Sequence, residues 1–388
     1  MTPSSRFKSL CLSQSLAVWL VLATPRLLRA ENSVTYKYED YREAGGRMAI
    51  QTQSALVQQS LGPDMQVKVA GVIDAIAGAT PNGQPAPAGS DQVVLTQMHD
   101  RRKAWNADFA RQFPGFNIDL GVANSRESDY TSTGWSINTI TDFNQKNTEL
   151  LLGVAGTDDD IKVFYQPAWA RKRTNDLIAG VTQVLDPQTS VVFNLSWGRA
   201  NGYLSDPYKL VQKSVQVAPG VFLPFTYGEN RPDTRTKWTV RASLNHAFAD
   251  WHAAIEASYR FYHDTFGTNA HTLELTWLQQ LGAHFILQPE LRFYDQSAAR
   301  FYYYQLDPTP IVPNFGAPRT QGPFYSSDHR LSALRTDTAG LKAIWQPKAG
   351  FQLDLAYERY DMRGKDGVTS QSAYPRADIV TAGIVLSW

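Results

Sequence analysis

The feature that most constrains the fold of this chain is a two-residue alternation of apolar and polar side chains over long segments. In residues 251–262, Ile255 and Tyr259 share one set of alternate positions, and Glu256 and Arg260 share the other. Because successive side chains of a β-strand point to opposite faces, such a segment predicts a strand with one apolar and one polar face. Strands of ten or more residues match the roughly 9–11 residues that a tilted strand needs to cross a bilayer.

Sixteen segments of the chain fit this description. The predicted strands are 33–42, 47–58, 64–75, 102–112, 116–126, 133–142, 147–156, 174–185, 190–199, 237–249, 251–263, 271–281, 284–295, 336–346, 351–361 and 378–388. An even number of strands suits a closed barrel made from a single chain. Fourteen or eighteen strands stay open as alternatives, because the second and fourth segments are weakly patterned.

The connections between the predicted strands alternate in length. Short connections lie at 61–64, 114–115, 144–146, 186–188, 250, 282–283 and 346–350, and long ones at 76–101, 156–173, 200–236, 296–335 and 362–377. Short turns at one rim and long loops at the other are typical of a bacterial outer-membrane barrel, with short periplasmic turns and long extracellular loops. The sequence therefore predicts an all-β, transmembrane, antiparallel up-and-down β-barrel of about sixteen strands.

The last residues of the chain support this prediction. Apolar side chains share one strand face up to a terminal aromatic residue, at Val380, Ala382, Ile384, Leu386 and Trp388. This pattern resembles the C-terminal signal by which the barrel assembly machinery recognises its clients. The alternative is an ordinary edge strand, but a long apolar edge favours aggregation, which barrel closure prevents. Several tryptophans lie near the ends of predicted strands, where a transmembrane barrel has its aromatic girdles at the lipid–water interface. They are Trp197, Trp251, Trp277, Trp345 and Trp388.

The N-terminus predicts export from the cytoplasm of a Gram-negative bacterium. Residues 1–30 have a basic start and an apolar core, and they allow cleavage after Ala23 or Ala30, which is the layout of a signal peptide. A buried N-terminal helix is the alternative. The expected mature chain is one outer-membrane barrel domain, residues 31–388. The single cysteine, Cys11, falls in the predicted signal, so neither a disulfide nor a cysteine-ligated metal is expected.

Composition excludes several functional classes. Lys and Arg total 37 against 36 Asp and Glu, so the basic excess of a nucleic-acid-binding protein is missing. Aromatic residues make up 12% of the chain, yet outside the N-terminus no run approaches the roughly twenty apolar residues of a membrane-spanning helix. The seven histidines lack metal-ligand spacing, and no G-x-S-x-G or phosphate-binding loop occurs. We therefore expect no metal centre and no catalytic residue. The run 158–160 of three aspartates could bind a cation, but a solvated loop is the preferred interpretation.

The polar faces of the predicted strands carry charges of both signs. If the apolar faces meet outer-membrane lipid, the polar faces line the lumen, at Arg241, Glu256, Arg260, Glu274, Glu290 and Arg292. These residues are the candidate pore lining, and a filled interior is the alternative. Loops 200–236 and 296–335 are long enough to fold inward as a plug, and their aromatic and proline content indicates ordered loops.

Several segments together resemble a known family. They are 180–185, 203–209, 259–262, 271–275 and 291–299, and they are similar to a bacterial family catalogued as domain of unknown function 3570. The likeness extends over nearly all of the predicted mature chain. It implies the barrel fold and the outer-membrane compartment, and it implies no particular activity.

One short motif suggests a cofactor. The stretch from Asp74 through Gly78 and Ala79 to Thr80 is similar to the acceptor motif of flavin transferases, which join FMN through its phosphate to a threonine or serine hydroxyl. Ala77 stands where that motif more often has serine or threonine. The alternative is a strand that runs into a turn of small residues. Covalent FMN on Thr80 would imply a flavin transferase and periplasmic redox proteins as partners.

The sequence thus favours a porin-like channel with a charged lumen rather than an enzyme. A flavinylated outer-membrane redox protein that transfers electrons outside the cytosol is one alternative. A structural or assembly partner in the cell envelope is another.

Overall fold

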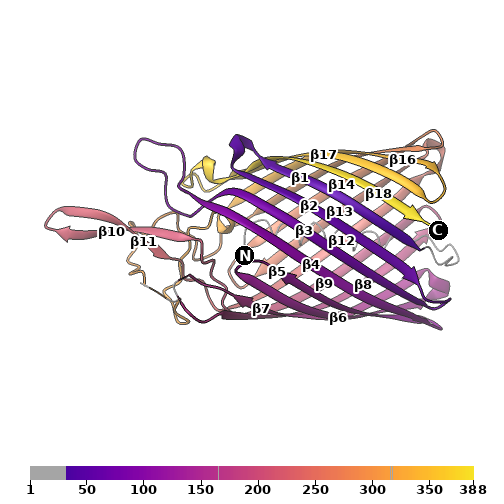
Figure 1. The fold of residues 1–388 in the computed structure, drawn as a ribbon, viewed down its shortest axis with the longest axis horizontal. Coiled ribbons are helices and arrows are strands. Elements are labelled where there is room, and N and C mark those ends of the chain that lie inside the picture. The colour runs from indigo at the N-terminus through magenta and orange to yellow at the C-terminus, as the bar shows by residue number, and fades with distance from the viewer. Residues whose placement is uncertain (1–31, 165, 315, 317) are drawn as a thin grey trace.

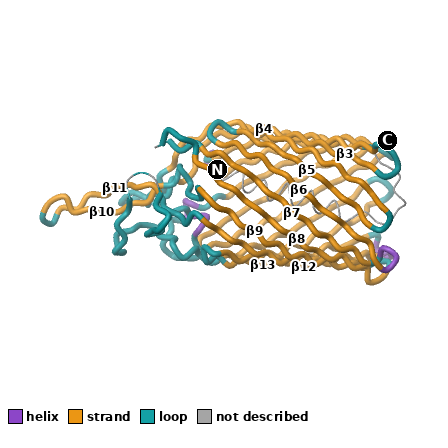
Figure 2. Tube along the Cα trace, turned by 90° about the horizontal axis from the view of Figure 1, so that it is seen from below, coloured by secondary structure: helices purple, strands orange, loops and turns teal. Residues whose placement is uncertain are grey.

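The chain closes into a single antiparallel β-barrel in the computed structural model, which describes residues 32–388 apart from 165, 315 and 317 (Figures 1 and 2). Sixteen strands form the wall. They are β1 (Ser33–Glu43), β2 (Met48–Ser60), β3 (Met65–Pro81), β4 (Leu95–Phe113), β5 (Phe116–Arg126), β6 (Tyr130–Phe143), β7 (Thr148–Ile161), β8 (Ala170–Asp186), β9 (Thr189–Gly202), β12 (Thr234–Phe248), β13 (Ala253–Asp264), β14 (Asn269–Leu281), β15 (Phe285–Gln296), β16 (Leu334–Lys348), β17 (Phe351–Gly364) and β18 (Arg376–Ser387). The predicted signal peptide, residues 1–30, lies outside the described residues.

The strand order confirms the predicted topology. Each barrel strand pairs with its neighbours along the chain, β9 pairs with β12, and β1 pairs with β18 to close the wall. Closure leaves no free edge in the wall, so the long apolar strands are protected from edge-to-edge aggregation. The remaining elements are 3-10 turns of three residues: η1 (Ala44–Gly46), η2 (Asn144–Lys146), η3 (Ala249–Trp251), η4 (His329–Leu331) and η5 (Gln371–Ala373). Within the part of the chain that the structure describes, no helix has the length and apolar composition of a membrane-spanning helix.

Every predicted strand coincides with a barrel strand, but several are longer than predicted. Strand β3 continues to Pro81 instead of ending at 75, and β4 begins at Leu95 instead of 102. These ends project beyond the expected bilayer, where apolar alternation is no longer required and the sequence pattern fades. Trp251 lies in η3, so β13 begins two residues later than predicted.

The sequence analysis missed a hairpin. Strands β10 (Leu210–Ala218) and β11 (Val221–Gly228) pair only with each other and project away from the barrel (Figures 1 and 2). Its tip is apolar and exposed, as at Phe222, which is 60% exposed. Residues 221–225 of β11 form a continuous apolar run without alternation, and both strands lie inside segment 200–236, which the sequence predicts to be a loop.

The two ends of the barrel differ. The predicted short turns lie at one end, together with Trp388, and we call this the turn end. The opposite end, the loop end, carries the five predicted long connections. Three further connections at the loop end are short, at 44–47, 127–129 and 265–268, so the alternation in loop length is less regular than predicted.

The outer surface has the pattern of a membrane protein. Trp238 and Phe248 stand ten positions apart on β12, which matches the span of a tilted strand across a bilayer. At the turn end, Phe248 stacks on Trp251 at 5.2 Å and on Trp277 at 5.4 Å between ring centroids. Such stacked aromatics form the interfacial girdle of a transmembrane barrel.

The C-terminal strand fits the same surface. Val380 and Leu386 are exposed on the outside of β18, on the same face as Ala382 and Ile384. Trp388 is 65% exposed at the turn end. The five residues of the predicted assembly signal therefore share the outer face, although their recognition by the assembly machinery stays a prediction.

Candidate functional site

The loop end of the barrel is covered by its two longest connections. Residues 203–209 and 229–231 of the first, and 325–332 of the second, are largely buried, and we call these three segments the cap. Leu204 and Leu331 pack with Phe266 and Phe301 in one apolar cluster. The prediction that these loops are ordered is confirmed, because the apolar and aromatic side chains that they carry pack against each other.

The cap contacts two separate parts of the wall. Tyr208 packs against a cluster on the inner faces of β2, β3 and β4, formed by Met48, Ile50, Ile76 and Met98. Tyr203 packs instead against the cluster of Tyr130, Ile161 and Val163, near β6, β7 and β8. Strands β3 and β7 are four strands apart in the sixteen-strand wall, so a segment that touches both groups spans part of the mouth of the barrel.

A network of buried charges holds the cap segments together. The Arg330 guanidinium lies 2.6 Å from the Asp206 carboxylate and 2.5 Å from that of Asp328. Arg231 lies 2.7 Å from Asp328 and 2.6 Å from Glu229. Glu229 also accepts hydrogen bonds from the backbone N–H of Asp206 and from the Ser326 hydroxyl. Three carboxylates face two guanidinium groups across segments more than a hundred residues apart, so the network fixes how the loops meet.

The electrostatics of the network explain how these charges stay ionised. Burial favours the neutral form of Asp206, but the surrounding positive charges, among them Arg330 and Lys209, together outweigh burial and lower the pKa of this carboxyl to about 2. Burial opposes the charge of Asp328 as well, and Arg330 and Lys209 hold its pKa well below the usual range. Burial lowers the pKa of the His329 imidazole to about 3, because it outweighs the opposing effect of the neighbouring Asp328 carboxylate. The closed cap therefore contains ionised aspartates and a neutral histidine.

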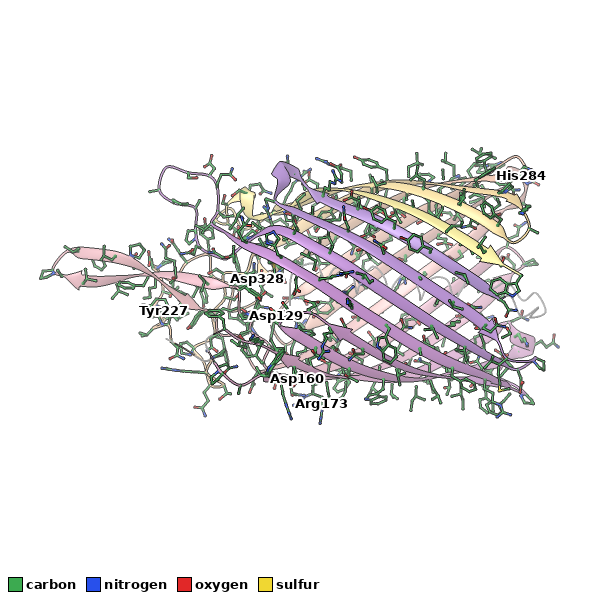
Figure 3. The ribbon with its side chains drawn as sticks, in the orientation of Figure 1. Asp129, Asp160, Arg173, Tyr227, His284 and Asp328 are labelled. Atoms are coloured by element: carbon green, nitrogen blue, oxygen red, sulfur yellow. The ribbon has the colours of Figure 1, made fainter. Side chains whose placement is uncertain are left out.

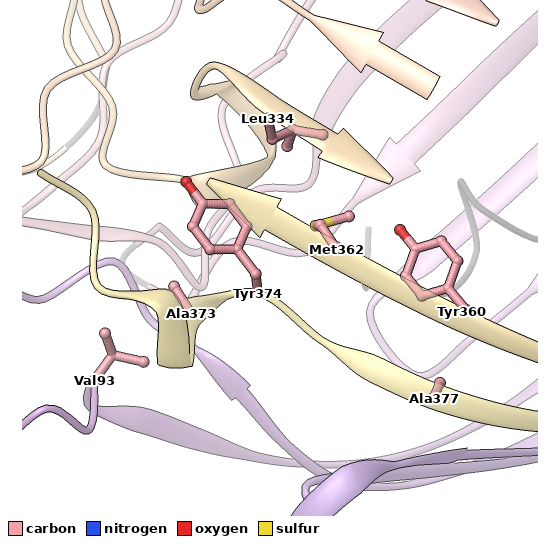
Figure 4. Close-up of a cluster of buried hydrophobic side chains, with 7 residues drawn as sticks. All are labelled: Val93, Leu334, Tyr360, Met362, Ala373, Tyr374 and Ala377. Atoms are coloured by element: carbon pink, nitrogen blue, oxygen red, sulfur yellow. The ribbon is translucent and has the colours of Figure 1, made fainter. Parts of the chain in front are cut away.

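Further contacts tie the cap to the barrel rim. Lys209 donates to the carbonyl of Pro81 at the end of β3, and Gln296 at the end of β15 donates to the carbonyls of Arg330 and Ser332 at 2.9 and 2.7 Å. Ser332 shares a 2.7 Å hydrogen bond with Tyr374. Tyr374 belongs to the apolar cluster of Figure 4, which joins loop 82–94 to β16, β17 and β18 through Val93, Leu334, Tyr360, Met362, Ala373 and Ala377.

Only a small space remains beneath the cap segments. A cavity of about 20 Å³ is lined by cap residues such as Ser205 and Arg231 and by Lys172 of β8. This volume holds about one water molecule. The cap segments are therefore closely packed around this cavity.

Below the cap, the predicted pore-lining residues meet on the inner wall. Glu274 of β14 lies 3.0 Å from Arg292 of β15 and 3.5 Å from Arg241 of β12. Arg260 donates to Thr272 at 3.1 Å. The side chains of Glu274 and Arg292 keep 28% and 30% of their exposure, so the interior at this level is hollow rather than packed. A barrel of sixteen strands has the width for such a lumen.

The remaining two predicted pore-lining residues, Glu290 and Glu256, also lie on the inner wall. Glu290 of β15 and Glu358 of β17 flank Gly340 of β16, where an added Cβ would stand 2.8 Å from Cγ of Glu290 and 2.9 Å from Cγ of Glu358. The bare glycine therefore makes room for two acidic side chains. Glu256 of β13 lies opposite Thr276 of β14 in the strand register, and Ser258 of β13 lies opposite Glu274 of β14. All six predicted residues come from four consecutive strands, β12 to β15, so they form one charged patch on the wall.

The predicted flavin motif lies in β3 at the loop end. Its Asp74 side chain is engaged by neighbouring strands of the wall, and its Thr80 is buried. Asp74 pairs with Arg102 at 2.6 Å and accepts a 2.7 Å hydrogen bond from Thr52. Thr80 is 4% exposed, and the cap residue Lys209 binds the carbonyl of the next residue. A nucleotide on the Thr80 hydroxyl does not fit beside the closed cap, so attachment would require the cap to move or to form afterwards. The FMN stays a prediction.

Gly78 of this motif has a structural role that can be tested. Its φ is +142°, and an added Cβ would overlap the Arg47 carbonyl oxygen and stand 2.7 Å from Cα of Met48. We expect Gly78→Ala to destabilise the barrel by about 1–3 kcal/mol, because both strain and overlap oppose it. Gly71→Ala on the same strand is the matched control, since nothing lies within 4 Å of its added Cβ. Urea unfolding in detergent measures both, and equal midpoints for the two variants would contradict the assignment.

The aspartate run 158–160 lies at the end of β7 and not in a loop, which corrects the sequence interpretation. Each aspartate pairs with a basic residue of β8: Asp158 with Arg173 at 2.7 Å, Asp159 with Lys172 at 2.7 Å, and Asp160 with Arg171 at 3.5 Å. Figure 3 shows Asp160 and Arg173 together at the loop end. Cross-strand ion pairs therefore account for this run.

The sequence pattern does not predict the buried ion pairs of the cap. Its charges are scattered over two long connections, and no spacing rule joins Asp206 to Arg330. A usable sign was present in segment 203–209, which was singled out by resemblance and contains Asp206 and Lys209. Charged residues amid aromatic and proline residues in a long loop are a further sign of a folded cap.

The fold and the site together define a transmembrane β-barrel with a charged lumen and a capped mouth. The chain matches the model of the family described as "Protein of unknown function (DUF3570)" over residues 20–380, and it belongs to that family. No curated protein matches the chain.

The solved structures to which the chain is similar are distant in sequence. The siderophore receptor PirA from Pseudomonas aeruginosa is 10% identical with a TM-score of 0.46, covering 93% of this chain and 62% of that one. CdiB from Acinetobacter baumannii is 7% identical with a TM-score of 0.51, covering 93% of this chain and 60% of that one. The chain therefore spans about three fifths of the length of these structures. The likeness to CdiB concerns the fold alone.

Proposed function

We propose that this protein is a gated channel of the outer membrane, with its turn end in the periplasm and its cap toward the cell exterior. The observation that carries the proposal is the contrast between the hollow, charged lumen and the closed mouth above it. The wall is held by continuous ladders of main-chain hydrogen bonds between strands. The cap is held by ion pairs, small apolar clusters and isolated main-chain hydrogen bonds, such as those between Asn230 and Tyr325. The cap can therefore open while the wall stays intact.

Conductance measurements test this function. We expect the purified barrel in a planar bilayer to be closed for most of the time and to show rare openings of uniform size. A loss of cap contacts should turn these into a sustained open state, as argued in the Discussion. A barrel that stays closed even after the cap network is broken would contradict a channel function and favour a structural or assembly role.

Covalent flavin on Thr80 is the second candidate, and the observation that favours it is the motif from Asp74 to Thr80 itself. The bound flavin would supply one- and two-electron redox chemistry, and Thr80 would hold it through a phosphoester bond. We expect co-expression with a flavin transferase to add one FMN to the intact protein by mass spectrometry, and Thr80→Ala to abolish the addition. Thr96→Ala, opposite Thr80 on β4, is the matched control. An unmodified wild-type protein, or an addition that survives Thr80→Ala, would reject this candidate.

A further inference from the structure

Three carboxylates meet at the loop end, away from both the lumen patch and the cap network. Asp100 comes from β4, and Glu127 and Asp129 come from the short turn between β5 and β6. One carboxylate oxygen from each lies within 4.8 Å of the others. Figure 3 shows Asp129 at the loop end of the barrel. Among the described residues, this is the group of acidic side chains whose spacing suits a bound metal ion.

Glu127 gives an independent reason to expect a ligand. The residue is 7% exposed, and its Oε2 atom is buried without a hydrogen-bond partner among the described residues. Burying an unpartnered carboxylate oxygen is costly, so such atoms in native proteins usually have a partner. Arg102, two residues from Asp100 on the same face of β4, is already engaged by Asp74 at 2.6 Å. A cation where the three carboxylates meet would give the buried Glu127 oxygen a partner.

The other two carboxylates are held in place and still have free lone pairs. The Ser128 backbone N–H and hydroxyl donate to Asp100 at 3.3 and 3.1 Å, and the Arg101 backbone N–H donates to it at 2.7 Å. The Tyr208 hydroxyl of the cap donates to Asp129. These donors orient the carboxylates, and an oxygen that accepts one hydrogen bond can still coordinate a cation.

We propose that Asp100, Glu127 and Asp129 bind a divalent calcium ion at the loop end. Carboxylate oxygens are the ligands that this hard cation prefers, and its flexible coordination tolerates ligands from a strand and a turn. Asp100 and Asp129 are only partly buried, so water can complete the shell. The bound ion would join β4 to the β5–β6 turn and fix Asp129 beneath Tyr208. The site thus ties the cap to the wall, and its existence does not depend on the proposed channel function.

Calcium titration of the full-length folded barrel in detergent, first stripped with EDTA, tests the proposal. We expect calcium to raise the thermal unfolding temperature of the barrel. Terbium bound at the same site should luminesce through energy transfer from Tyr208 and Tyr130, and calcium should displace it. Glu127→Gln keeps the shape of the side chain and removes its charge, and it should weaken calcium binding by at least about tenfold. Asp158→Asn is the control, because this exposed aspartate pairs with Arg173 outside the cluster.

Three results would overturn the proposal. They are a stripped wild-type barrel that binds no calcium, a Glu127→Gln barrel that binds as tightly as wild type, and a site that binds magnesium in place of calcium. If Glu127→Gln does not fold, Asp100→Asn replaces it, and unchanged affinity in that variant has the same meaning.

Discussion

Replacement of Arg330 by alanine is expected to convert a mostly closed barrel into a persistently conducting one. Arg330 neutralises Asp206 and Asp328 inside the cap, at 2.6 and 2.5 Å. Its removal leaves the buried Asp206 without its guanidinium partner and Asp328 with Arg231 as its remaining one. Breaking a buried ion pair in this way typically costs about 3–5 kcal/mol. The substitution destabilises the closed cap relative to the open cap, because water solvates the aspartates when the cap is open. The strand pairing of the wall does not involve Arg330, so the barrel remains folded.

The matched control for this variant is Arg363→Ala. Arg363 also forms an arginine–aspartate pair, with Asp361 at 3.0 Å, but its side chain is 56% exposed on the outside of the barrel. Exposed pairs of this kind contribute little to stability, so the control should stay closed. Single-channel recordings give the open fraction, and heat-modifiable gel mobility verifies folding. An Arg330→Ala barrel that is folded and closed would show that the cap network does not gate the lumen.

Acid is the second condition expected to have a large effect, and it should open the cap through His329. Burial lowers the pKa of His329 to about 3, against an ordinary value of 6.5, so the closed cap disfavours the protonated imidazole. Stability of the closed cap is unaffected by this group above pH 6.5. It falls progressively as the pH drops from 6.5 toward 3, by about 1.4 kcal/mol for each pH unit. At pH 4.5 the expected loss is about 3 kcal/mol.

Other groups in the cap modify this response. Asp206, whose pKa is lowered to about 2, adds to the loss only below its ordinary value of 3.8. Burial raises the pKa of Glu229, so protonation of this carboxyl opposes opening. His329→Gln isolates the histidine, because glutamine does not titrate. We expect the open fraction of wild type to rise between pH 6.5 and 4.5, and that of His329→Gln to stay nearly flat. Parallel curves for the two proteins would exclude His329 as the sensor.

The agreement between sequence and structure is strongest in the wall. The segment 285–294 alternates strictly because one face meets lipid and the other the lumen, and it became β15 with nearly the predicted bounds. Agreement is weaker at the loop end of β3 and β4, since strands outside the bilayer do not need that alternation. It fails for β10 and β11, because they pair with each other outside the wall.

The candidate site divides in the same way. Glu274 and Arg292 could be paired from the sequence, since they lie on polar faces of consecutive strands that a short turn connects. Asp206, Asp328 and Arg330 could not, because loops have no register that relates distant positions. Glu127 gave no sign of its burial, which depends on how the β5–β6 turn packs beneath the cap.

The sequence by itself determined a barrel of about sixteen strands, its two unlike ends and the charged face of its strands. It could do so because the period of a strand is local and each side chain has one of two environments. Only the tertiary structure decided that the mouth is closed, that Thr80 lies beneath the cap, and that Asp100 meets Glu127 and Asp129. These outcomes depend on contacts between segments far apart in the chain, and such contacts leave no repeating pattern in the sequence.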